Sequence, residues 1–113
     1  MQLTGKQIVE KGLVTNYCDE GVQQQGIDVR VAGINELHLI GRIPTEGKTQ
    51  LPEYKPKPVS DGGFWYLQTG YYEVILEEGF KLKSDTAMVF KTRSSLVRCG
   101  AIVESGQFDA GFE

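Results

Sequence analysis

RSSLVRCGAIVESGQFDAGFE, residues 93–113, contains the most informative chemistry in this chain. It opens with the guanidinium of Arg93 and two serine hydroxyls, continues through an apolar stretch that is typical of a strand, and turns at a Ser-Gly pair. A planar cation beside hydroxyl and amide donors suits a phosphate chain. The stretch closes on Asp109, a carboxylate between two phenylalanines that could hold and deprotonate a water. The second of these phenylalanines, Phe112, could lie against a sugar ring.

Three short motifs, taken in order, resemble those of the trimeric dUTPase and dCTP deaminase superfamily. Residues 93–96 (RSSL) resemble its second motif, and residues 108–113 (FDAGFE) resemble its third. Residues 26–30 (GIDVR) resemble the first, in which Gly-hydrophobic-Asp-Leu-Arg is usual. The resemblance implies an all-β fold in the main, a distorted, jelly-roll-like β-barrel of the β-clip kind with a short N-terminal helix. We expect residues 1–113 to form a single domain of this kind.

The resemblance also implies roles for individual residues in binding phosphate and activating water. Arg93, Ser94 and Ser95 would bind the phosphates of the nucleotide, often from a neighbouring subunit. Asp109 would activate the attacking water while Mg²⁺ and arginine offset the phosphate charge. Asp28, in the first motif, would either hold the metal indirectly, through water, or have a structural role.

The base and the sugar would be recognised by the third motif and the residues before it. A hairpin is expected over residues 101–108, with Ser105 near its turn, and the resemblance implies that backbone groups there, at Gly106 and Gln107, read the pyrimidine edge. Uracil and cytosine differ in their donors and acceptors, so such readout can discriminate between them. Phe112 would lie against the deoxyribose and exclude a 2′-hydroxyl.

The superfamily contains two chemistries, and the sequence favours one. The deaminases use a glutamate on the strand after the third motif, which would follow Glu113, and usually carry a Thr-Ala pair where Ser105, Gly106 and Gln107 stand here. We therefore expect a dUTP diphosphatase. The alternatives are a dCTP deaminase or bifunctional enzyme, favoured by residues 93–98 (RSSLVR), and an inactive nucleotide-binding or trimer-scaffold module.

The fourth and fifth motifs of the superfamily would follow Glu113, so we expect this chain to lack the C-terminal strands and glycine-rich tail. A homotrimer is expected because one small barrel cannot supply every motif to one site. The substrate would be a pyrimidine deoxynucleoside triphosphate, dUTP or else dCTP.

Composition excludes several other classes of protein. The net charge of −3 over 113 residues argues against a nucleic-acid binder, which normally carries a basic face. No apolar run reaches the roughly 20 residues that cross a bilayer, and residues 1–13 do not form a signal peptide. We expect a soluble cytoplasmic protein without a membrane partner, in which Cys18 and Cys99 are reduced.

Periodicity and turn signals predict one helix and several short strands. Thr4 and Gln7 form the pattern of a capping box, so a helix is expected over residues 4–13. Alternating or β-branched runs predict strands over residues 27–32, 36–40, 62–68, 70–77 and 87–91, with a short one near 49–51. Residues 17–25 and the proline-containing 41–60 are expected to be loops, the latter a solvated connector rather than a basic recognition loop.

Two further features have an ordinary and a functional interpretation. The aromatic run at residues 64–66 and 71–72 could stack bases, but a core or a subunit interface is the more common use of such a cluster. His38 stands alone and is expected to be structural rather than catalytic.

Overall fold

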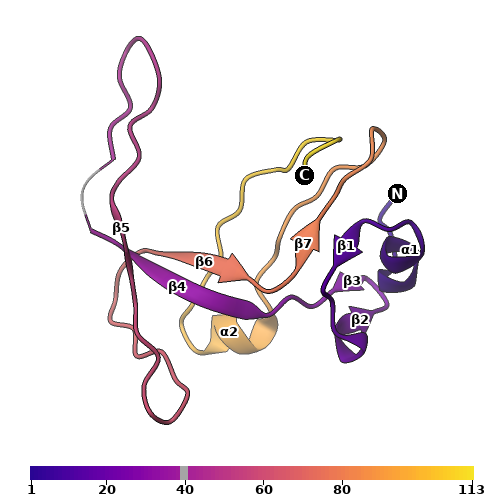
Figure 1. Ribbon diagram of the computed structural model, residues 1–113, viewed down its shortest axis with the longest axis horizontal. Helices are drawn as coiled ribbons and strands as arrows, with labels where there is room; N and C mark the ends of the chain where they lie inside the picture. The colour runs from indigo at the N-terminus through magenta and orange to yellow at the C-terminus, as the bar shows by residue number, and fades with distance from the viewer. Residues whose placement is uncertain (39–40) are drawn as a thin grey trace. The chain divides into compact units, whose positions relative to one another are not determined.

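The computed structural model describes residues 1–38 and 41–113, in which short strands predominate, as the sequence predicts. The described residues form two compact units: a terminal unit, Met1–Asp28 with Glu78–Glu113, and a central unit, Val29–Glu77. The helices and strands in chain order (Figure 1) are α1 (Gly5–Glu10), β1 (Val14–Thr15), the 3₁₀ turn η1 (Asp19–Gly21), β2 (Val22–Gln23), β3 (Gly26–Ile27), β4 (Val31–Leu37), β5 (Tyr54–Pro56), β6 (Tyr72–Leu76), β7 (Gly79–Phe80) and α2 (Ser94–Arg98).

The strands within the described ranges make three small antiparallel sheets and no closed barrel. The sheets pair β1 with β7, β2 with β3, and β4 with both β5 and β6. The prediction of a mainly β fold is confirmed. Among these same residues, no helix has the length and apolarity needed to cross a membrane.

The capping box predicted at the N-terminus is present. The Gln7 N–H donates to the Thr4 hydroxyl over 3.1 Å, and the Gln7 side chain accepts from the Thr4 N–H over 2.9 Å. The helix is shorter than predicted because it ends by Lys11, and Gly12 then takes a positive φ of 69°. α1 packs on the β2–β3 hairpin through Gly5, where an added Cβ would lie 2.5 Å from the carbonyl oxygens of both Gln23 and Gly26.

The core of the terminal unit lies around β1 and β7. Leu13, Val14 and Leu82 are its buried apolar side chains, and the Lys81 N–H donates to the Leu13 carbonyl over 2.9 Å. Cys18 and Cys99 are both free cysteines, the first half-buried and the second exposed. This core is small, so hydrogen bonds and ring contacts outside it must hold the rest of the unit.

A row of four phenylalanines extends across the terminal unit. Phe80 contacts Phe90 with ring centroids 5.6 Å apart, and Phe90 contacts Phe108 at the same distance, both edge to face. Phe108 contacts Phe112 at 4.9 Å. Edge-to-face pairs of this kind contribute about 0.5–1.5 kcal/mol beyond the area that they bury. The row links β7 to the third motif.

The central unit is built on β4, which pairs with β5 on one side and β6 on the other (Figure 1). Separate strands over residues 27–32 and 36–40 were expected, and this division is wrong, because β4 continues through Gly33, with a register irregularity between Val31 and Gly33. Among the described residues of this unit, Ile34 is the buried apolar side chain. The part of the second prediction that falls on residues 39–40 lies outside the described residues.

Other predictions for the central unit need correction. Residues 62–68 form a turn and an irregular stretch instead of a strand, held where the Ser60 N–H donates to the Phe64 carbonyl over 2.8 Å. The strand expected near residues 49–51 is only an isolated bridge between Arg42 and Gln50. The connector expected over residues 41–60 contains β5, which is an edge strand of its sheet and so tolerates Pro56.

The C-terminal stretch also differs from the prediction. The apolar run after Ser95 begins in a helix, α2, and ends in a turn at Gly100, which has a φ of 84°. The Ala101 N–H donates to the Leu96 carbonyl over 3.0 Å and the Gly100 N–H to the Val97 carbonyl over 2.9 Å, the paired bonds of a Schellman motif. The strand over residues 87–91 and the hairpin over 101–108 are replaced by one isolated bridge, between Met88 and Phe108.

Candidate nucleotide-binding site

The first and second motifs meet at an ion pair in the terminal unit. The Arg93 Nη1 atom lies 2.9 Å from the Asp28 Oδ2 atom. Asp28 follows β3, where its N–H donates to the Gly21 carbonyl over 2.8 Å, and Arg93 is the N-cap residue of α2. The Arg93 side chain is 67% exposed and that of Asp28 30%. Because exposed pairs contribute roughly 0–1 kcal/mol to stability, this contact orients the guanidinium more than it stabilises the unit.

Arg93 keeps further donors for a ligand. Its guanidinium has N–H groups besides the one that Asp28 accepts, and these have no other partner within the described residues. Ser94 and Ser95 follow in the exposed first turn of α2, and their hydroxyls likewise have no hydrogen-bond partner among those residues. One oriented cation and two adjacent hydroxyls therefore stand open to solvent, a set of donors that suits a phosphate.

Asp109 is held by its backbone, with an exposed side chain. The chain on its N-terminal side is fixed at Phe108, whose N–H donates to the Met88 carbonyl over 2.8 Å. On the other side, the Asp109 carbonyl accepts from the Phe112 N–H over 3.1 Å, and Gly111 provides a positive φ of 84° for this turn. Within the described residues the Asp109 carboxylate has no hydrogen bond or ion pair, so it is available to a water.

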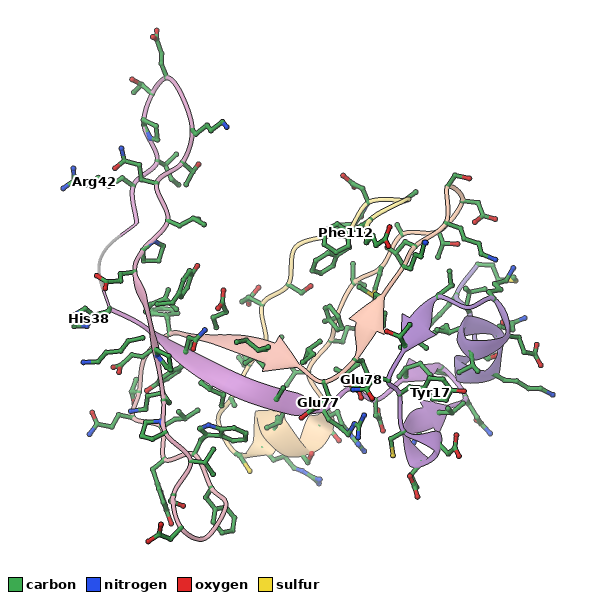
Figure 2. All side chains as sticks on the ribbon, viewed as in Figure 1. Tyr17, His38, Arg42, Glu77, Glu78 and Phe112 are labelled. Atoms are coloured by element: carbon green, nitrogen blue, oxygen red, sulfur yellow. The ribbon has the colours of Figure 1, made fainter. Side chains whose placement is uncertain are left out.

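Phe112 combines a packed side and an open side. Its ring contacts Phe108, its carbonyl accepts from the Leu82 N–H over 2.7 Å, and it remains 47% exposed (Figure 2). A half-exposed ring fixed in this way can present a flat apolar surface to a sugar.

Gly106 and Gln107 are exposed and lie in an irregular stretch that hydroxyl groups connect to the segment before Arg93. The Val103 N–H donates to the Thr92 hydroxyl over 2.7 Å, and the Phe90 N–H donates to the Ser105 hydroxyl over 3.4 Å. Sequence reasoning assigned no role to either hydroxyl. The only signal is position, since Thr92 precedes the second motif and Ser105 precedes the expected base-reading residues.

The structure thus brings some of the predicted site residues together. Asp28 contacts Arg93, and Asp109 shares a turn with Phe112. Between these two clusters there is no hydrogen bond or ion pair within residues 1–38 and 41–113. The assignment of all these residues to one site remains a prediction.

A magnesium ion fits the donors that are present. The described part of the chain has no group of three or more His, Cys, Asp or Glu side chains suited to a metal. Mg²⁺ is usually held by one or two carboxylates, several waters and substrate phosphates. A single carboxylate such as Asp28, acting through water, is compatible with that mode of binding.

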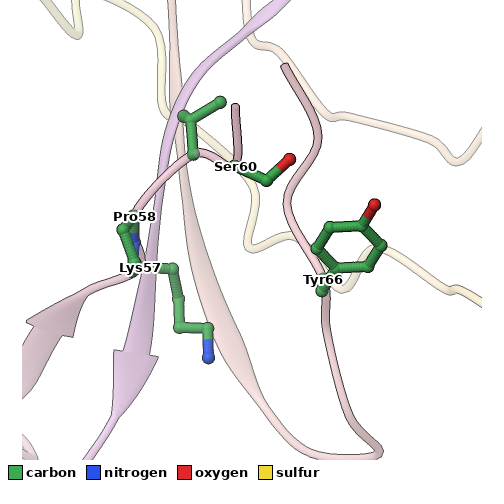
Figure 3. A pocket seen from close by; sticks show the side chains of 5 residues that line it. Lys57, Pro58, Ser60 and Tyr66 are labelled. Carbon is green, nitrogen blue, oxygen red and sulfur yellow. The ribbon is translucent and has the colours of Figure 1, made fainter. Parts of the chain in front are cut away.

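The central unit contains a shallow cavity that the motifs do not explain. It has a volume of about 260 Å³ and is lined by Lys57, Pro58, Val59, Ser60 and Tyr66 (Figure 3). None of the predicted site residues lines it, and none of its five lining residues is buried.

Comparison with protein families gives one match that spans nearly the whole chain. Residues 2–113 match the family described as dCTP deaminase-like. No solved structure matches the chain.

Several archaeal proteins are similar to this chain. One from Archaeoglobus fulgidus, named probable deoxyuridine 5′-triphosphate nucleotidohydrolase, is 33% identical over 96% of this chain and 65% of its own length. A protein of the same name from Methanosarcina acetivorans is 30% identical over 80% of this chain and 54% of its own length. The deoxyuridine 5′-triphosphate nucleotidohydrolase of Methanocaldococcus jannaschii is 32% identical over 91% of this chain and 67% of its own length. This chain therefore spans between half and two thirds of the length of these relatives.

Proposed function

The chain belongs to the dCTP deaminase-like family, and from this premise we propose that it is part of a dUTP diphosphatase, which converts dUTP to dUMP and pyrophosphate. The family description alone leaves deamination and hydrolysis open. The observation that carries the proposal is that relatives named for dUTP hydrolysis match up to 96% of the chain.

In the proposed reaction, Arg93, Ser94 and Ser95 donate hydrogen bonds to the phosphate chain. Asp28 holds the guanidinium in place by the 2.9 Å contact, so less side-chain freedom is lost when the phosphate binds. Mg²⁺, when bound, would offset the phosphate charge. The negative charge of the whole chain makes these local cations necessary.

Asp109 accepts a proton from the attacking water in this proposal. The water oxygen bonds to phosphorus, the bond between the α and β phosphates breaks, and pyrophosphate leaves. The exposed, unpaired carboxylate described above supports this role, as does the turn that fixes it beside Phe112. Phe112 lies against the deoxyribose in the same proposal.

Deamination of dCTP, alone or together with hydrolysis, is the second candidate, favoured by the description of the matching family. The test is to give the full-length protein dUTP and dCTP separately with magnesium, and to measure pyrophosphate and ammonia. Pyrophosphate from dUTP without ammonia from dCTP is expected. Ammonia from dCTP would replace the proposal with a deaminase, and neither product would favour a non-catalytic module.

A homotrimer and a cytoplasmic location belong to the same proposal. Exposed aromatic side chains in the central unit support a subunit interface there: Phe64 is 63% exposed, Tyr66 74% and Tyr71 85%. Phe64 and Tyr66 lie together, with ring centroids 6.5 Å apart, and contiguous exposed apolar patches commonly mark an interaction surface. Sedimentation of the purified protein tests the trimer, and a monomer would contradict it.

A further inference from the structure

We propose that Ser105 determines the preference for uracil over cytosine by fixing the orientation of the peptide between Gly106 and Gln107. This inference rests on the proposed function, since it concerns how the same site reads its base. It names a residue outside the three motifs.

The Ser105 hydroxyl has two hydrogen-bond partners. It accepts from the Phe90 N–H over 3.4 Å and donates to the Gly106 carbonyl over 2.8 Å. A hydroxyl has a single proton to donate. Because the Phe90 N–H occupies a lone pair, the proton remains directed at the Gly106 carbonyl. Ser105 therefore holds that carbonyl oxygen in one direction.

The orientation of this carbonyl determines the direction of the next N–H. A trans peptide is planar, so the Gly106 C=O and the Gln107 N–H point to opposite sides. The chain has no cis peptide bond within the described residues. The Gln107 N–H consequently points away from Ser105, and it has no hydrogen-bond partner within the described residues.

The space beside this peptide is open. Gly106 and Gln107 are exposed, and a Cβ added at Gly106 would meet no atom within 4 Å. An outward N–H in open space is a donor that a flat base edge can reach. Uracil presents a carbonyl oxygen at ring position 4, whereas cytosine presents an amino group there. A fixed N–H donor pairs with the first and opposes the second.

Thr92 provides a matched comparison. Its hydroxyl also links the two segments, by accepting from the Val103 N–H over 2.7 Å, but it makes no contact with the Gly106 carbonyl. Loss of the Thr92 hydroxyl should loosen the link without releasing the base-reading peptide. We therefore expect removal of the Ser105 hydroxyl, but not of the Thr92 hydroxyl, to change the preference for dUTP over dCTP.

The experiment compares Ser105→Ala, Ser105→Thr and Thr92→Val with the unchanged full-length protein. For each, kcat/KM is measured for pyrophosphate release from dUTP and from dCTP, with binding of inorganic tripolyphosphate as a probe of the phosphate half alone. In Ser105→Ala the preference for dUTP should fall about tenfold, the loss of one hydrogen bond. Ser105→Thr, which keeps the hydroxyl, should retain the preference. Thr92→Val should lower kcat/KM for dUTP and for dCTP by the same factor. Tripolyphosphate binding should be unchanged in Ser105→Ala.

The outcomes separate this inference from the proposed function. Suppose that the unchanged protein prefers dUTP. If Ser105→Ala then keeps the full preference, or if its kcat/KM falls by the same factor for dUTP and dCTP, the inference is overturned while dUTP hydrolysis stands. If the unchanged protein releases no pyrophosphate from dUTP, the proposed function fails and the inference fails with it. Unfolding midpoints in urea for all four proteins ensure that an altered ratio does not arise from unfolding.

Discussion

The Asp28 carboxylate and the Arg93 guanidinium are 65 residues apart in the sequence and 2.9 Å apart in the structure. This contact joins the first motif to the second. It orients the Arg93 guanidinium through a contact that the sequence alone does not predict. The contact acts mainly by orienting the guanidinium, because a surface ion pair contributes only roughly 0–1 kcal/mol to the stability of the fold.

Asp28→Asn should therefore weaken nucleotide binding more than it weakens the fold. The amide removes the charge that orients Arg93, so KM for dUTP should rise about tenfold, as for loss of a charge-assisted hydrogen bond. The free energy of unfolding should fall by no more than about 1 kcal/mol. Glu10→Gln is the control, since it removes the exposed Lys6–Glu10 pair of 3.9 Å from α1 and should leave KM unchanged. An equal rise in KM for both variants would contradict the role of Asp28.

Asp109→Asn tests proton transfer from the attacking water. The amide cannot accept that proton, so kcat should fall by about 10²–10⁴ while the affinity for dUTP changes little. Single-turnover pyrophosphate release and equilibrium binding separate the two effects. The control is Asp85→Asn, a second exposed aspartate of the terminal unit, which accepts a 2.9 Å hydrogen bond from the Thr86 hydroxyl. Undiminished turnover in Asp109→Asn would remove Asp109 from the mechanism.

Phe112→Ala tests recognition of the sugar. Loss of the ring should raise KM for dUTP and reduce the preference for dUTP over UTP by about tenfold, the scale of one well-packed contact. Phe112→Leu retains an apolar group against Phe108 and serves as the control for packing. The measurement is the ratio of kcat/KM for the two nucleotides. An unaltered ratio in the alanine variant would show that Phe112 does not read the sugar.

Gly5→Ala tests how closely α1 approaches the β2–β3 hairpin. Alanine normally stabilises a helix by about 1 kcal/mol relative to glycine. Here its Cβ would lie 2.5 Å from two carbonyl oxygens, so overpacking should reverse the sign and cost about 1–3 kcal/mol. Urea unfolding measures the change. Gly106→Ala, where no atom lies within 4 Å, is the control and should be nearly neutral for stability.

The features that sequence predicts well are those fixed by local chemistry. The capping box of Thr4 and Gln7 predicts the start of α1, and the aromatic and apolar run in residues 70–77 predicts β6. None of these inferences requires knowledge of distant contacts.

The failures have physical causes of two kinds. Leu96 and Val97 suit a strand, but the Schellman bonds around Gly100 close a helical turn there, and the glycine was the signal that was missed. β5 was not predicted because Pro56 and the prolines around this strand suggest a loop, although an edge strand accepts a proline. The second kind is non-local: neither the Asp28–Arg93 contact nor the Ser105 link follows from spacing along the chain.

The hydrogen bonds between residues 88–92 and 103–108 come from the Met88–Phe108 bridge and from two side-chain hydroxyls. A ladder of peptide groups would persist through almost any exchange of side chains, whereas a hydroxyl is lost by a single nucleotide change in the gene. A single substitution at Ser105 is therefore expected to alter the base preference while the backbone hydrogen bonds between these segments stay in place.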